Sequence, residues 1–168
     1  TEPALFAGPP RLRRFYPNLL VIEYAPFAGF DVQAEYWAPD SHTVLCRQTM
    51  SNHTGQPISV LLELCAQLVP LEGQSLAATS LHSVNVLAGK TSGLAPVVFI
   101  TGGPHPGTGP YPSLALDLAF AAGGSRTLTW CQAALGSRED SFELARRTAS
   151  RAFEAERTRI EMRNTSQV

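Results

Sequence analysis

Short extended segments separated by glycine and proline fill the first 136 residues of this chain, with no helical spacing of apolar residues between them. Phe30, Val32, Ala34 and Tyr36 alternate with polar residues, which is the period of two expected of a half-buried strand. Comparable segments occupy residues 19–24, 43–50, 58–68, 76–87, 96–101, 114–120 and 127–133. About eight regularly spaced strands predict a mainly β fold, an antiparallel two-sheet β-sandwich.

Residues 52–57 are rich in turn formers and lie between two predicted strands, so we expect them to close a hairpin. The second of these strands carries apolar residues on one face and Leu61 and Cys65 on the other, which predicts a central strand covered on both sides. The core shared by the two sheets is predicted to contain Val60, Leu62, Leu64, Leu116, Leu118 and Phe120.

The chain changes character after this region, because the last 31 positions hold 13 of its 27 charged residues. Residues 137–140 match the Ser-x-x-acid pattern of a helix start, and Phe142, Phe153 and Ile160 recur at helical spacing beyond it. The sequence therefore predicts one long C-terminal helix.

This change suggests two parts, a β-sandwich domain over residues 1–136 and a charged linker helix over 137–168 that leads to a further C-terminal domain. The stripe on the helix can pack on the sandwich or on a second copy of the chain, which makes a homo-oligomer one expectation. A charged fraction of 16%, against about 25% in typical soluble domains, also indicates that much surface is hidden in a core or against a neighbour.

Charge and hydropathy exclude several partner classes. The net charge is -1, and no basic patch with interleaved aromatic residues supports nucleic-acid or anionic-membrane binding. No apolar run approaches the ~20 residues that span a bilayer, and residues 1–10 do not resemble a signal peptide. Cys46, Cys65 and Cys131 are widely spaced and odd in number, so we expect buried free thiols and favour a cytoplasmic location.

The most conspicuous loop covers residues 102–112, where eight of eleven residues are glycine or proline. Proline fixes the backbone and glycine lets it turn, so such a loop projects a definite shape and presents His105 and Tyr111 on it. We expect a ligand or partner loop, with a plain connection between the sheets as the alternative.

Other motifs give little support to catalysis. The histidines at 42, 53, 82 and 105 are scattered, so neither a metal nor another cofactor is implied. The Gly-Lys-Thr at 89–91 lacks the first glycine of a phosphate-binding loop, and no nucleophile motif is present. Glu35 and Glu63 could share a sheet face as paired carboxylates, although strand carboxylates are more often on solvated outer faces.

Two further features depend on context. Trp37 and Trp130 could stack against a sugar, although aromatic residues at strand positions are usually in the core. Asn52-x-Thr54 and Asn164-x-Ser166 match glycosylation acceptors, which matter only in a secreted protein.

The order of these segments resembles a known family. Residues 44–64, with Arg47, Met50, Asn52 and Thr54 before the apolar run 58–62, are followed much later by Leu-Asp-Leu-Ala-Phe at 116–120 and Gly-Gly-Ser at 123–125. Together with the charged helix, this pattern is similar to the N-terminal β-sandwich, a supersandwich, of bacterial glycoside hydrolases whose catalytic domain is a helical (α/α) toroid. The family sandwich usually has more strands than are predicted here.

The resemblance implies a non-catalytic, carbohydrate-associated domain that supports a helical catalytic barrel. In that family the catalytic acids lie in the toroid, so no catalytic residue is carried over to this chain. The implied partners are a C-terminal helical domain of the same protein and an oligosaccharide. An Ig-like structural or protein-interaction module without a sugar role is the alternative function, and a small stand-alone enzyme ranks last.

Overall fold

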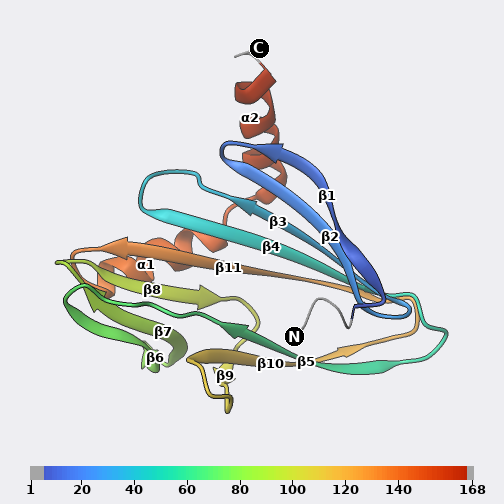
Figure 1. Ribbon diagram of the computed structural model, residues 1–168, viewed down its shortest axis with the longest axis horizontal. Coiled ribbons are helices and arrows are strands. Elements are labelled where there is room, and N and C mark those ends of the chain that lie inside the picture. Colours follow the sequence, from blue (N-terminus) through green and yellow to red (C-terminus); the bar gives the residue numbers. More distant parts are fainter. Residues whose placement is uncertain (1–5, 166–168) are drawn as a thin grey trace.

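The computed structural model describes residues 6–165 of the chain, and the side chains of residues 6–163. An eight-stranded and a three-stranded antiparallel sheet face each other, and two helices cover part of the other side of the larger sheet (Figure 1). The larger sheet contains, in spatial order, β1 (Gly8–Tyr16), β2 (Leu19–Phe27), β3 (Phe30–Trp37), β4 (Thr43–Asn52), β11 (Ser125–Leu135), β8 (Ala95–Ile100), β7 (Val84–Thr91) and β6 (Gly73–Leu81). The smaller sheet contains β5 (Ile58–Cys65), β10 (Ser113–Phe120) and β9 (His105–Pro106). The predicted antiparallel sandwich is confirmed.

The two faces of the larger sheet support two separate cores. Between the sheets, Leu116, Leu118 and Phe120 are buried, and Val60, Leu62 and Leu64 pack against them partly buried, as predicted. On the other face, Leu45, Val97 and Cys131 pack beneath the helices. Side chains alternate between the faces along each strand, so every central strand contributes to both cores.

The expected hairpin at residues 52–57 is wrong, because these residues carry the chain from one sheet to the other. β4 pairs with β3 and β11, whereas β5 pairs with β10. β5 is consequently an edge strand of the smaller sheet, and Leu61 on its outer face is 61% exposed. The strand is covered on one side, not on both.

Asn52 fixes this crossover and is itself fully buried. Its amide nitrogen Nδ2 donates to the carbonyl oxygens of Gln56 and Ala121, each at 2.9 Å. Its Oδ1 accepts from the backbone N–H and the hydroxyl of Thr54, at 2.9 and 2.6 Å. Asn52 is therefore a structural residue, inaccessible to a glycan. The second acceptor sequence, at 164–166, lies outside the described side chains.

Residues 76–87 form parts of two strands instead of one. β6 and β7 are joined at His82 and Ser83, whose φ values of 48° and 65° place both in the left-handed region of a tight hairpin turn. Neither residue is the asparagine or glycine that usually signals such a turn. β6 lies at the edge of the larger sheet, as expected for this polar segment.

The predicted single C-terminal helix is two helices, α1 (Arg138–Ala149) and α2 (Phe153–Thr165). Ser137 caps α1 as expected, because its side chain accepts from the backbone N–H of Asp140. Ser150 ends this helix by directing its backbone N–H and its hydroxyl to the carbonyl of Arg146. No helix within residues 6–165 is long and apolar enough to cross a bilayer.

All three cysteines are free, which agrees with the absence of a disulfide pattern. Cys46 and Cys131 are buried as expected, and burial raises the pKa of each thiol to about 12. Cys65 is exposed on the outer face of β5, contrary to expectation, because that strand lies at an edge.

Candidate functional site

Polar side chains from neighbouring strands lie in register across the helix-bearing face of the larger sheet. Arg11 lies opposite Glu23, Glu23 opposite Gln33, and Gln33 opposite Thr49. Cross-strand partners share a face, so these residues form one row. The apolar rows that carry the helices lie further along the same strands, at Trp37 and Leu45.

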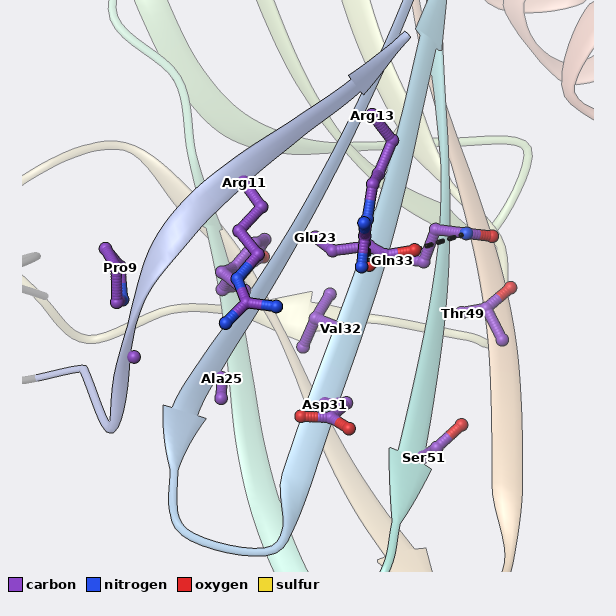
Figure 2. A pocket seen from close by; sticks show the side chains of 12 residues that line it. Pro9, Arg11, Arg13, Glu23, Ala25, Asp31, Val32, Gln33, Thr49 and Ser51 are labelled. Carbon is purple, nitrogen blue, oxygen red and sulfur yellow. Dashed lines mark hydrogen bonds and ion pairs between the residues drawn. The ribbon is translucent and has the colours of Figure 1, made fainter.

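This row forms the floor of a groove of about 520 Å³, with β1 as one wall (Figure 2). We call it the N-terminal groove, and its lining residues are Gly8, Pro9, Arg11, Arg13, Glu23, Tyr24, Ala25, Asp31, Val32, Gln33, Thr49 and Ser51. Its volume lies within the range of about 300–1,000 Å³ that is usual for small-molecule sites. The groove is the candidate binding site of the described chain.

An ion pair organises the centre of the groove. Nε of Arg13 donates to Oε2 of Glu23 at 2.6 Å, and Nε2 of Gln33 donates to Oε1 of the same carboxylate at 3.2 Å (Figure 2). The hydrogen bond from Arg13 lowers the pKa of Glu23, with smaller contributions from Gln33 and from the charge of Arg11. Glu23 is therefore ionised at neutral pH, and both its oxygens already accept a hydrogen bond.

The far side of the groove is lined by hydroxyl groups. Thr49 pairs with Thr127 of β11 at 3.3 Å between the hydroxyl oxygens, and Ser51 pairs with Ser125 at 2.8 Å. Hydroxyls both donate and accept, so this side offers groups of either kind to a ligand. At the end of the groove, Asp31 lies 3.3 Å from the imidazole of His53.

The loop at 102–112 exposes the two residues predicted to act there. The side chain of His105 is 52% exposed and Tyr111 is 57% exposed. Nδ1 of His105 contacts the carbonyl oxygen of Pro106, and Nε2 contacts a carboxylate oxygen of Asp117. Both contacts favour the doubly protonated ring and therefore raise the pKa of His105. The carbonyl of Pro106 has the larger effect and Asp117 the smaller.

The base of this loop is fixed to the sandwich. Asn85 donates to the carbonyl of Pro104 at 2.9 Å, and the N–H of Gly107 donates to the carbonyl of Ser113 at 3.0 Å. The hydroxyl of Ser113 in turn donates to Glu63 at 2.5 Å, and a side chain on Gly107 would collide with both of these groups. The loop is thus anchored close to its exposed residues, and its role as a ligand or partner loop stays a prediction.

The two tryptophans proposed for sugar stacking lie in the cores. Trp37 is 6% exposed and packs against Phe153 of α2, with ring centroids 4.8 Å apart. Trp130 is partly buried against the core between the sheets, with its ring 6.1 Å from that of Tyr36. We do not retain Trp37 as a stacking platform, because its ring is covered from solvent.

Glu35 and Glu63 do not form a carboxylate pair. Glu35 lies on β3 and forms an ion pair of 3.0 Å with Arg157 of α2, whereas Glu63 lies on the outer face of β5 in the other sheet. Burial raises the pKa of Glu35, and the charge of Arg157 opposes this shift. Within residues 6–163, no three His, Cys, Asp or Glu side chains form a cluster that could hold a metal.

The N-terminal groove is not evident in the sequence, because β1 lacks the regular alternation that predicts a strand. Gly8, Pro9 and Pro10 open this strand, and two register shifts against β2 interrupt its alternation. The available signal was the recurrence of arginine at 11, 13 and 14 beside an apolar strand.

No family model matches this chain, and no curated protein matches it significantly. Among solved structures, a protein assigned as a kojibiose phosphorylase from the human microbiome is similar over 82% of this chain and 21% of its own, with a TM-score of 0.58 and 10% identity. A protein assigned as an aldose 1-epimerase from Escherichia coli K12 is similar over 76% of this chain and 69% of its own, with a TM-score of 0.52 and 10% identity. At this identity the likeness establishes the fold, a β-sandwich that also occurs in sugar-related proteins.

Proposed function

We propose that this chain is a non-catalytic, carbohydrate-associated β-sandwich domain that supports the helical catalytic domain of a glycoside hydrolase. The observation that carries the proposal is the extent of the fold match. It covers 82% of this chain but only 21% of the chain assigned as a kojibiose phosphorylase, so the corresponding part is one portion of a much larger sugar-related protein.

Exposed apolar side chains are consistent with a neighbouring domain. Leu12 and Phe15 on β1 are 62% and 72% exposed, and Val69 and Leu71 in the connection after β5 are 84% and 88% exposed. Leu12 and Phe15 lie at one edge of the larger sheet, and Val69 and Leu71 precede the strand at its other edge, so two separate regions offer apolar surface to a neighbour. The low charged fraction of the sequence led to the same expectation.

The carboxylate pair suggested by the sequence, Glu35 and Glu63, gives no support to catalysis. Glycoside cleavage requires two carboxyl groups that flank one bond, about 5–9.5 Å apart. Glu35 and Glu63 lie on different sheets, and Glu35 is already paired with Arg157. The alternative, an Ig-like interaction module, would predict that neither this chain nor its parent protein responds to sugars.

Turnover assays of the purified chain with a panel of aryl glycosides test the proposal, and we expect no hydrolysis. Hydrolysis that the single change Glu63→Gln abolishes would overturn it. In the parent protein, replacing His105 and Tyr111 together with alanine should reduce activity while the melting temperature of this domain stays nearly unchanged. Equal activity of that double variant would reduce the loop to a connector.

A further inference from the structure

The charges in the N-terminal groove are balanced, and one cation is free. Arg13 is neutralised by Glu23, and Asp31 lies beside His53. Within the described residues, the side chain of Arg11 forms no hydrogen bond or ion pair, and it acts on Glu23 only through its charge. The guanidinium of Arg11 therefore retains all its hydrogen-bond donors for a ligand.

We propose that the N-terminal groove binds a short segment of a neutral oligosaccharide through side-chain hydrogen bonds. This inference rests on the proposed function for the class of ligand, and on the groove for its location. Arg11, Gln33, Thr49 and Ser51 supply the hydrogen bonds, while the Arg13–Glu23 pair holds Gln33 in place.

The pattern of donors and acceptors matches a polyol. Neighbouring strands are about 4.8 Å apart, so the groove presents a polar group at each such step across β1 to β4. Nε2 of Gln33 is committed to Glu23, which leaves its amide oxygen to accept, beside the hydroxyls of Thr49 and Ser51. Sugar hydroxyls donate and accept at short intervals and can use both kinds of group.

Charge selects against ionic ligands in this groove. A phosphate or carboxylate attracted to Arg11 would also approach Glu23 and Asp31, which carry the same sign of charge as the ligand. A cation would meet Arg11 and Arg13. A neutral ligand avoids both penalties, because repulsion between like charges is costly where water is partly excluded.

The affinity is expected to be low, because the groove lacks an aromatic platform. Tyr24 is the one aromatic residue among its lining residues, and it packs against the core between the sheets. Sugar sites without stacking depend on hydrogen bonds that compete with water, and each such bond contributes little net free energy. We therefore expect a dissociation constant on the order of 1 mM.

Titration of the ¹⁵N-labelled chain with maltose, maltotriose and, separately, inorganic phosphate tests the proposal by NMR. We expect saturable shifts of the backbone amides near Glu23, Gln33 and Thr49 with at least one of the sugars and none with phosphate. Arg11→Ala and Gln33→Ala should each weaken binding by about fivefold or more, as loss of one charge-assisted or amide hydrogen bond predicts. Arg126→Ala is the matched control, because Arg126 lies opposite Met50 on the other face of the sheet.

Three results would overturn the proposal: no saturable shift with either sugar, shifts confined to residues 102–112, or binding of phosphate alone. Unchanged melting temperatures of the variants show that any loss is local. Failure of sugar binding in the groove can be distinguished from failure of the proposed function. A supporting domain that binds no sugar would still hydrolyse no glycoside. Conversely, turnover by this chain would refute the supporting role even if the groove binds sugar.

Discussion

α1 and α2 lie on the same face of the larger sheet but are held there by different forces. α1 inserts Phe142, Ala145 and Ala149 into an apolar surface, where they are 1%, 0% and 9% exposed. α2 buries Ile160, packs Phe153 against Trp37, and forms ion pairs with the sheet through its charged side chains. The sheet surface changes from apolar to polar between the two helices, which explains the difference.

The ion pairs of α2 connect it to three strands of the sheet. Arg157 pairs with Glu35 of β3, and Glu161 pairs with Arg14 of β1. Glu154 pairs with Arg47 of β4 at 2.8 Å. The more exposed pairs, Arg14–Glu161 and Arg47–Glu154, contribute about 0–1 kcal/mol each, whereas a fully buried large apolar side chain contributes about 1.5–3 kcal/mol. α1 should therefore be part of the cooperative fold, and α2 should open at lower cost.

The largest effect is expected from Phe142→Ala. Removing this buried ring leaves a cavity beside Phe99, so the free energy of unfolding should fall by about 3–5 kcal/mol. Denaturant unfolding followed by circular dichroism measures the change. Phe15→Ala is the control, because its ring is 72% exposed and its loss should cost well under 1 kcal/mol. Equal losses in the two variants would show that α1 is not anchored through Phe142.

A smaller effect, on the order of 1–2 kcal/mol, is expected from Arg157→Gln, which leaves the buried carboxylate of Glu35 without its partner. Burial already raises the pKa of Glu35, and loss of Arg157 should raise it further. The ionised form is then costly in the folded state, so stability should be lost as pH rises through the folded-state pKa. The difference from wild type should be greatest near pH 7 and shrink as pH falls towards the ordinary value of 4.5. A difference that does not change with pH would contradict this account.

Ser137→Ala should cost about 1 kcal/mol, because it removes the side chain that caps α1. The expected readout is faster hydrogen exchange in the first turn of α1. Ser137→Asp is the matched control and should retain most of the protection, since aspartate also accepts from the exposed N–H groups. Loss of protection in both variants would indicate that the hydroxyl has another role.

The smallest effect is expected from salt. Raising the ionic strength to about 1 M shortens the screening length to about 3 Å and weakens exposed ion pairs by a few tenths of a kcal/mol each. Hydrogen exchange from Phe153 onward should accelerate, while exchange in α1 stays constant. Equal responses of both helices would remove the distinction between them.

The sequence predicted the sandwich well, because alternation along single strands is a local property. Strand partners are not local, and this explains the wrong hairpin at 52–57. Its turn residues signalled a change of direction, but the partner of β5 is β10, some fifty residues later in the chain. The break between α1 and α2 was missed because residues 150–152 contain neither glycine nor proline.

The candidate sites were harder to predict, for a related reason. His105 and Tyr111 were identified because glycine and proline mark an exposed loop directly in the sequence. The N-terminal groove requires Arg11, Glu23, Gln33 and Thr49 from four strands, and each of these residues alone resembles an ordinary polar residue on a solvated strand. Only the register between the strands brings them into one row.

The position of β11 has a consequence for biosynthesis. The larger sheet consists of two groups of strands that are consecutive in the chain, β1 to β4 and β6 to β8. Within the described residues, β11 alone joins the two groups. At about 5–20 residues per second, the ribosome takes several seconds to proceed from the end of β4 to the start of β11. The edge of β4 has no partner throughout that time, and the edge of β8 has none from the synthesis of β8 until that of β11. Unpaired edges recruit other chains. Because β11 completes the sheet and is made last, the edges of β4 and β8 stay unpaired until then. A chaperone would have to cover these edges to prevent pairing with other chains.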